Sequence, residues 1–419
     1  MDPDDTAPAG RIASAGRALR SGTFASLSLG QFRLLLAGTA FSQVGGWMEM
    51  VARGWLVLEL THSPFQLGLM AFIGGLSALV AAPVAGVIAD RLDRRALAAG
   101  TQLFEALIAL TIGLLVAVDR IEMWQLYLTA GIGGAVFAVN MPARQVLVYD
   151  VVGAGHLTNA IALNSVVANI ARIGAPSLGG GIIAATGIEQ AFYAEALFFL
   201  LATAATFLLR PMTVAKPVRV PMLQGVRDGF DYVRRDATVL RLVLLNVIPN
   251  VLIYPYVGLF PIFADKILGV GSTGYGLLLS GVGFGSIPGG LMVASMSGST
   301  GKGRAMAGAA ILYMGMVAVF AASSWFPLSF AILIVAGVGW SMMAILNQTL
   351  LQLQLTDDTM RGRVLAFYSM ASGLTPFGNL TMGAAADQWG VQKAVAAFAL
   401  TGLALTAYLG LGSARIRRL

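Results

Sequence analysis

Two charged residues within one long apolar stretch have the types and the spacing that proton chemistry requires. Glu49 and Arg53 are four residues apart, so on a helix they share one face with Ser42 and Gly46. A charge in the middle of a bilayer is costly unless it is paired or hydrated. This face is therefore expected to point into the protein or a water-filled cavity. A carboxylate beside a cation suits proton binding and release; the alternative is an ion pair that only fixes the rotation of the helix.

A third charge, Arg172, lies near the middle of another apolar stretch without an acidic residue one helical turn away. It needs a partner from elsewhere, and the candidates are Glu49, Glu105 or a substrate anion. Glu105 and Glu195 each lie within about three turns of the end of their stretch, which favours structural roles for both. We therefore assign proton coupling to Glu49, Arg53 and Arg172.

The elements that must hold these charges are membrane helices. The 419 residues are 57% hydrophobic and 11% charged, and the mean hydropathy is +0.78. Soluble domains are about half apolar and about a quarter charged. The absence of cysteine excludes disulfides and thiolate metal sites, and both histidines, His62 and His156, fall in short connecting segments. We expect no metal site, no cofactor and no Ser-His-Asp arrangement.

Twelve mostly apolar stretches are long enough to cross about 30 Å of hydrocarbon. Six precede a polar segment, and six follow it: 34–59, 65–89, 97–118, 123–149, 158–185, 190–209, then 239–264, 273–297, 305–323, 327–352, 362–386 and 392–413. This pattern predicts an all-α polytopic membrane protein with two pseudo-symmetric six-helix bundles. The predicted parts are a tail at 1–33, a bundle at 34–209, a linker at 210–238, a bundle at 239–413 and a tail at 414–419.

The distribution of basic residues predicts the orientation. Of the 27 lysines and arginines, all but five lie in the tails, the linker or loops on one side. The excess of Lys and Arg marks the cytoplasmic side, so both termini and the linker are expected in the cytoplasm. The expected location of the protein is the cell (inner) membrane. The net charge of +7 thus faces lipid and argues against nucleic acid. Apolar residues recur at helical spacing near 222–235, which predicts an amphipathic surface helix in the linker.

The turn between the second and third stretches carries a recognisable signature. Gly86, Asp90, Arg91, Arg94 and Arg95 match the loop motif Gly-x-x-x-Asp-Arg-x-Gly-Arg-Arg/Lys, with an aspartate where the second glycine usually stands. The turn resembles that of the major facilitator superfamily. The resemblance implies a gate in which Asp90 acts on the cytoplasmic end of the eleventh helix. In this sequence, Arg361 and Arg363 stand at the start of that helix. Without the resemblance, the turn would indicate topology alone.

The fifth stretch carries a second signature. Pro176, Gly179 and Gly180 match the Gly-Pro-x-x-Gly-Gly end of the superfamily's antiporter motif, and Ala175 stands in place of its first glycine. Proline and glycines also predict a bent helix that packs closely on its neighbour. Further stretches at 55–64, 142–165 and 361–365 resemble the secretion-effector branch, which includes enterobactin exporters and macrolide efflux pumps. That resemblance implies export of a small amphipathic organic molecule, a siderophore, drug or metabolite, by proton antiport through alternating access.

Polar and aromatic residues in spans one, four, seven and ten are the candidates for the substrate cavity, because these spans face the centre in the superfamily. They are Gln43, Trp47, Asn140, Asn246, Asn250, Tyr254, Trp340 and Asn347. Aromatic and amide groups around a few charges suit amphipathic organic molecules. Two alternatives stay open. One is a uniporter or proton-coupled importer of a small solute or lysophospholipid, and the other is a transport-dead sensor or polytopic enzyme. The expected partners are substrate, protons and lipid, and the expected state is a monomer.

Overall fold

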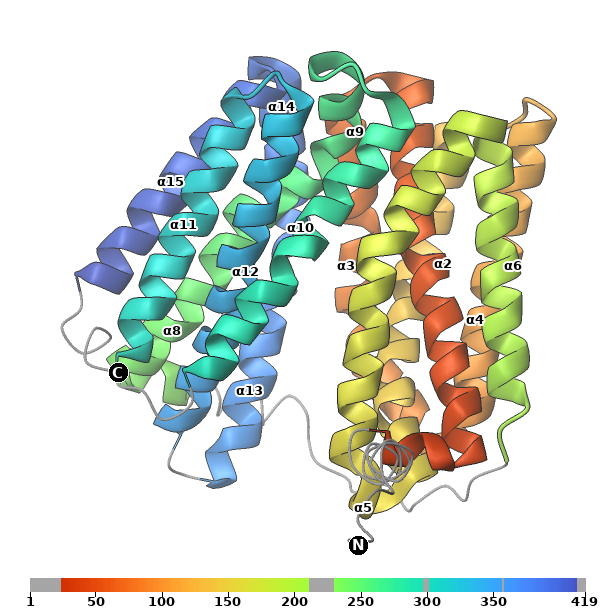
Figure 1. Cartoon of the computed structure of the whole chain (residues 1–419), viewed down its shortest axis with the longest axis horizontal. Coiled ribbons are helices and arrows are strands. Elements are labelled where there is room, and N and C mark those ends of the chain that lie inside the picture. Colours follow the sequence, from red (N-terminus) through yellow and green to blue (C-terminus); the bar gives the residue numbers. More distant parts are fainter. Residues whose placement is uncertain (1–23, 211–229, 297–300, 356–357, 413–419) are drawn as a thin grey trace, which may run out of the picture.

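The computed structural model describes residues 24–210, 230–296, 301–355 and 358–412. Within these ranges the chain is helical, apart from short turns. The first half consists of α2 (Gly30–Thr61), α3 (Pro64–Arg91), α4 (Arg94–Ala117), α5 (Met123–Thr186) and α6 (Ile188–Phe207). The second half begins with α8 (Ala237–Ile248) and continues through α10 (Gly271–Ser295), α11 (Lys302–Ala322), α12 (Phe326–Gln354), α13 (Asp358–Ser372), α14 (Thr375–Trp389) and α15 (Val391–Leu411). The two halves stand side by side as two helix bundles (Figure 1).

The fold-class prediction of twelve spans in two six-helix bundles is confirmed. Within the described residues, nine helices are long and apolar enough to span a membrane. One of them, α5, has 64 residues and leaves helical geometry at Gly153 (φ 65°, ψ 179°). At about 1.5 Å per residue it is long enough to cross twice, so it contains predicted spans four and five. The helix α2, with Glu49 and Arg53, and the pair α13 and α14 supply the other spans.

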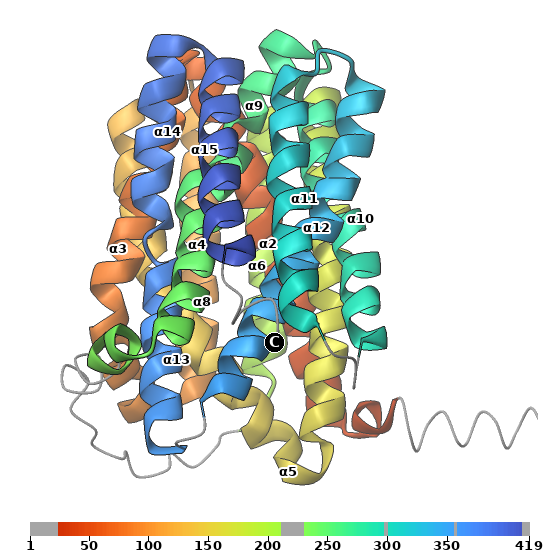
Figure 2. The same ribbon diagram turned by 90° about the vertical axis from the view of Figure 1, so that its left-hand side faces the viewer.

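Two predicted single spans are interrupted. Span seven continues beyond α8 as four short segments of different helical pitch: Pro249–Ile253, Tyr254–Leu259, α9 (Phe260–Ile262) and Phe263–Ile267. Prolines at 249, 255 and 261 each remove a backbone donor, which accounts for the repeated change of pitch. Span eleven divides at Gly373 into α13 and α14, which Figure 2 shows end to end.

Short polar signals end one span and start the next. His62 adopts a left-handed conformation (φ 51°), and Ser63 caps α3 by accepting a hydrogen bond from the Gln66 N–H at 3.4 Å. Asp93 caps α4 through the Arg95 N–H, and Asp236 caps α8 through the N–H groups of Thr238 and Val239. Residues 230–235 are helical, and the rest of the predicted surface helix lies outside the described residues.

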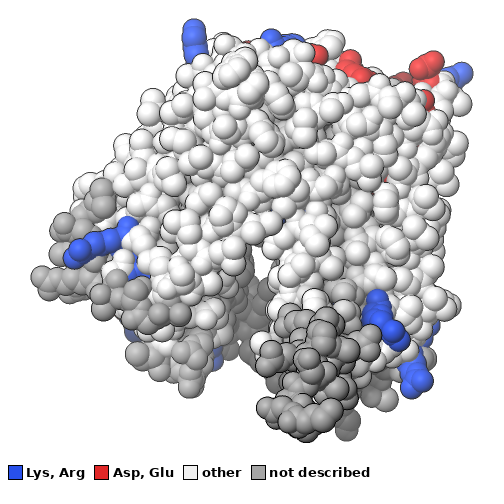
Figure 3. Space-filling view, viewed as in Figure 1, with Lys and Arg blue, Asp and Glu red and all other residues white. Residues whose placement is uncertain are grey.

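The two ends of the molecule differ. We call the linker end the one that holds residues 92–93, 153, 208–210 and 230–236, and the opposite end the one that holds 62–63, 118–122, 187, 323–325 and 390. The halves meet toward the opposite end, where α3 packs on α14 and α5 packs on α10. Figure 3 shows a hollow between the halves at the linker end. The molecule is therefore captured with its central cleft open to the linker end.

Candidate functional site

Glycines of the antiporter-like motif bring the two halves into contact toward the opposite end. A methyl group at Gly180 would overlap the carbonyl oxygen of Ser272 on α10, and one at Gly276 would overlap the carbonyl oxygen of Pro176. The Ser272 hydroxyl donates to the Gly180 carbonyl at 3.1 Å. Gly179 lies against Met48 of α2. The predicted close packing of this helix is therefore present, and its partner is the other half of the protein.

Further contacts between the halves lie near the same end. The Tyr275 hydroxyl donates to the Met50 carbonyl at 3.1 Å, and its ring stacks on Trp55. Ser63 donates to Asp387 at 2.9 Å, and the Lys266 ammonium donates to the His62 carbonyl at 3.1 Å. These contacts close the opposite end of the cleft.

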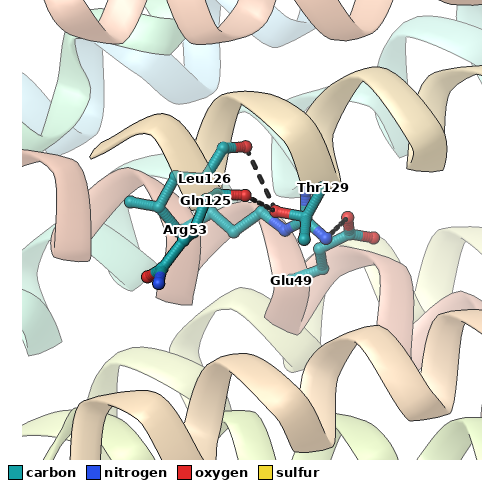
Figure 4. A network of polar contacts seen from close by, with 5 residues as sticks. All are labelled: Glu49, Arg53, Gln125, Leu126 and Thr129. Atoms are coloured by element: carbon teal, nitrogen blue, oxygen red, sulfur yellow. Dashed lines mark hydrogen bonds and ion pairs between the residues drawn. The ribbon is translucent and has the colours of Figure 1, made fainter. Parts of the chain in front are cut away.

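A polar cavity of about 440 Å³ lies within the first half, between α2, α3, α4 and α5. We call it the carboxylate cavity. Its polar lining consists of Ser42, Gln43, Glu49, Arg53, Gln102, Glu105, Asn140 and Arg144. Glu49 and Arg53 form the predicted i,i+4 ion pair, with 3.2 Å between Oε1 and Nη2 (Figure 4). The Arg53 side chain is 7% exposed and that of Glu49 is 24% exposed, so the acid is the accessible member of the pair.

Three carboxyl groups from three helices act electrostatically on Arg53. Besides Glu49 of α2, its charge interacts with Glu195 of α6 and Glu105 of α4. A methyl group at Gly133 would lie 3.7 Å from Glu105 Oε2 and 4.0 Å from Arg53 Nη1, so these two groups face the same point. Glu195 is fully buried, and neither of its carboxyl oxygens has a hydrogen-bond partner. From the sequence, Glu105 and Glu195 were expected to have structural roles, and their approach to Arg53 was not predicted. The rarity of acidic residues in membrane spans is the signal that could have indicated it.

Amides and a second arginine complete the cavity wall. The Arg144 guanidinium donates to the Ser42 hydroxyl at 2.7 Å, and Asn140 donates to Thr101 of α4. The predicted cavity residues Gln43 and Asn140 therefore line the same cavity as Glu49.

Arg172 occupies a different cavity, between the two halves. This cavity of about 160 Å³ is lined by Trp47, Arg172, Tyr254, Tyr256, Val257, Leu279, Val282, Gly283, Tyr313 and Trp340. We call it the aromatic cavity. The Arg172 guanidinium carbon lies 5.8 Å from the ring centroid of Trp47 and 5.2 Å from that of Trp340. Trp47, Tyr254 and Trp340, three predicted cavity residues, thus converge on Arg172, whereas the structure does not bring Arg172 to Glu49.

The remaining predicted cavity residues make contacts within the second half. Asn347 of α12 is buried and donates to the Leu242 carbonyl of α8 at 3.1 Å. Asn250 donates to the Asn246 carbonyl at 2.8 Å, and Asn246 donates to the Tyr368 carbonyl at 3.4 Å. Neither cavity described above includes these amides. These residues were predicted to line the cavity because they belong to spans seven and ten. Membership of a span does not specify which face of the helix turns toward the cavity.

The charged turn lies at the linker end. Asp93, which replaces the usual glycine of the motif, caps α4. Arg94 forms an ion pair with Asp150 of α5 at 2.8 Å, and Arg95 lies over the Phe207 ring at 4.9 Å from the centroid. Gly86 lies in α3 with open space around it, and Arg363 is exposed in α13. The side chains of Asp90, Arg91 and Arg361 lie outside the described residues, so the predicted contact between Asp90 and the eleventh span stays a prediction.

Comparisons with known proteins agree with this architecture. The chain is 22% identical over 377 residues to a staphyloferrin A transporter of Staphylococcus aureus (strain NCTC 8325 / PS 47), covering 87% of this chain and 91% of that one. It is 26% identical over 388 residues to the multidrug efflux pump Tap of Mycolicibacterium fortuitum, covering 90% and 94%. A match to the uncharacterized MFS-type transporter YfiS of Bacillus subtilis (strain 168), 29% identical over 207 residues, spans about half of each chain (48% of both).

The crystal structure of the nucleoside transporter NupG shares the fold, with a TM-score of 0.72 at 15% identity over 91% of this chain and 98% of that one. The model of the transmembrane secretion effector family matches residues 21–417, nearly the whole chain. This membership sets aside the enzyme alternative and confirms the resemblance found in the charged turn and the fifth span. The chain is a multi-pass membrane transporter of the major facilitator superfamily and belongs to its transmembrane secretion effector family.

Proposed function

We propose that this transporter exports a small amphipathic organic molecule from the cell by proton antiport. The observation that carries the proposal is the Glu49–Arg53 ion pair in the carboxylate cavity. Glu49 is the more exposed member of this pair and lines the cavity. It is therefore placed to take up and release a proton while Arg53 stays buried beside it. The two relatives that match over most of their length, a staphyloferrin A transporter and a multidrug efflux pump, support an organic substrate.

The neighbouring charges give the proton site its electrostatic balance. When Glu49 binds a proton, the carboxyl groups of Glu105 and Glu195 remain as neighbours of Arg53, and a buried cation needs one such group in its charged form. Arg144 lies in the same cavity on the Ser42 hydroxyl. We assign coupling to Glu49 with Arg53 as its partner. Arg172, which was also assigned to proton coupling from the sequence, lines the other cavity in this conformation.

The decisive experiment measures uphill export in everted membrane vesicles that contain the Glu49→Gln variant. We expect gradient-driven uptake into these vesicles to fall to background, while energy-independent exchange of substrate persists. Glu59→Gln is the matched control, because Glu59 lies on the same helix outside the carboxylate cavity and only accepts from Trp55 at 2.6 Å. Normal pH-dependent pumping by Glu49→Gln would move coupling to another carboxyl. Facilitated movement without any proton requirement in the wild type would instead favour a uniporter.

Direction depends on the orientation, and we propose that the linker end faces the cytoplasm, with both termini inside and the protein in the cell membrane as a monomer. The bias of basic residues supports this orientation. The chain contains no cysteine, so each single-cysteine variant has one reactive thiol, and labelling reports the accessibility of that position alone. An impermeant maleimide added outside cells should label positions in 61–64 and 388–392 and spare positions in 92–95 and 300–303. The reverse pattern would overturn the orientation and, with it, export.

A further inference from the structure

The aromatic cavity contains the guanidinium of Arg172. Among the described residues, no carboxylate lies within ion-pair distance of Arg172, and its buried Nε has no hydrogen-bond partner. The two indoles that flank it come from opposite halves, Trp47 from α2 and Trp340 from α12. Stacking on indole faces stabilises a guanidinium but supplies no acceptor for its in-plane N–H groups, and the Nε–H has none. Those groups match the oxygens of a carboxylate.

A second unpaired group lines the same cavity. Tyr256 is fully buried, and its hydroxyl has no hydrogen-bond partner. Its ring makes edge-on contacts with Phe260, Tyr313 and Phe320. Packing therefore explains why the ring is buried, but not why the hydroxyl is buried without a partner. A buried donor without an acceptor costs free energy, and an acceptor on a ligand removes that cost. Both unpaired donors belong to residues that line the cavity, and the lining contains no acidic side chain.

The size and the walls of the cavity restrict what accompanies the acceptor. A volume of about 160 Å³ is close to that of an engineered cavity of about 150 Å³ that accepts benzene. Aliphatic side chains of Val257, Leu279 and Val282 line it next to the indoles. These walls favour a flat apolar group of about one ring over a hydrated ion.

We propose that the aromatic cavity recognises a carboxylate carried on an aromatic ring, and that the exported substrate belongs to this class of anionic aromatic compounds. The cavity takes residues from both halves, so a bound anion holds them together through Arg172. Glu49 and Glu105 line the other cavity, and no carboxylate lines the aromatic cavity next to a bound anion. The substrate assignment rests on the proposed export function, whereas binding of the anion does not.

The experiment titrates the purified full-length protein with benzoate, neutral benzamide and cationic benzylamine, and follows intrinsic tryptophan fluorescence and calorimetric heat. We expect benzoate to bind at least about tenfold more tightly than benzamide, because charge-assisted hydrogen bonds to Arg172 are lost with the amide. Benzylamine should not bind. Arg172→Gln should abolish the preference for benzoate, and Arg172→Lys should retain only part of it, because an ammonium does not offer the planar donor pair.

Two tyrosines provide a matched pair that separates recognition from packing. Tyr256→Phe removes the unpaired hydroxyl, so benzoate affinity should fall several-fold with no loss of thermal stability. Tyr275→Phe removes a hydroxyl that is bonded to Met50 and lies outside the aromatic cavity, so stability should fall and benzoate affinity should not change. Equal binding of benzoate and benzamide, or an unchanged preference in Arg172→Gln, would overturn the proposal.

Failure of this inference and failure of the proposed function are distinguishable. Glu49→Gln should lose gradient-driven export and retain benzoate binding, because Glu49 does not line the aromatic cavity. Benzoate selectivity together with uphill transport by Glu49→Gln would leave the anion site standing and refute only the coupling site. Loss of benzoate selectivity in Glu49→Gln would refute the separation of the two cavities.

Discussion

The two cavities each hold a buried arginine and balance its charge in opposite ways. In the carboxylate cavity, Arg53 is paired with Glu49 and has Glu105 and Glu195 as further electrostatic neighbours, all within one bundle. In the aromatic cavity, Arg172 lies between two indoles contributed by different bundles and has no carboxylate partner among the described residues. A cation with spare acids suits proton exchange, and a cation with none suits a ligand anion. Under the proposed function, proton exchange and substrate recognition take place in separate cavities.

The largest expected difference between the cavities is in stability. Arg53→Met leaves three carboxyl groups without their cation, and breaking a buried pair in this way costs about 3–5 kcal/mol of unfolding free energy. Arg172→Met leaves no carboxylate behind and loses only stacking on the indoles, about 1 kcal/mol. Chemical unfolding of both variants in detergent measures the difference. Adding Glu49→Gln to Arg53→Met should restore part of the loss; equal losses in the two single variants would break the comparison.

A smaller effect is expected at the closed end, where α5 of the first bundle meets α10. Gly180→Ala places a methyl group against the Ser272 carbonyl, so we expect a loss of about 1–3 kcal/mol through overpacking and a cleft that opens more readily at the opposite end. Gly181→Ala is the control, because a methyl group there has nothing within 4 Å and should stabilise the helix by up to about 1 kcal/mol. Thermal unfolding measures the stabilities. Outside labelling of a cysteine introduced at Val51, which is buried next to Gly179, measures the opening. Identical behaviour of the two alanine variants would show that this contact does not close the cleft.

The smallest expected effect concerns the wall of the carboxylate cavity. Asn140 of α5 donates to Thr101 of α4, and Asn140→Ala should cost about 1 kcal/mol. Thr101→Val should cost a similar amount, and the double variant should cost less than the sum, since both changes remove one interaction. Benzoate binding in the aromatic cavity should not change in any of these variants. A large drop in that binding would show that the cavities are not independent.

Local patterns were sufficient for several features of this protein. Stretches of about 20 apolar residues define the spans because the hydrocarbon of a bilayer requires that length. The basic turn after the second span and the Pro-Gly segment in the fifth span indicate the family. The Glu49–Arg53 pair was also predictable, because residues four apart on one helix face must be neighbours. The breaks were harder to place. Three prolines six residues apart divide span seven, yet proline is common in membrane helices and does not by itself specify a change of pitch.

Contacts between distant helices were decided only in the tertiary structure. The meeting of Glu49, Glu105 and Glu195 around Arg53 depends on how α2, α4 and α6 rotate toward one another, and hydrophobicity alone does not encode rotation in lipid because every face is apolar. For the same reason Asn347 was expected in the cavity and is found against Leu242 of α8. Arg172 was expected near Glu49 and instead stacks between Trp47 and Trp340. The sequence alone determined which residues are charged inside the membrane; helix packing decided which of them meet.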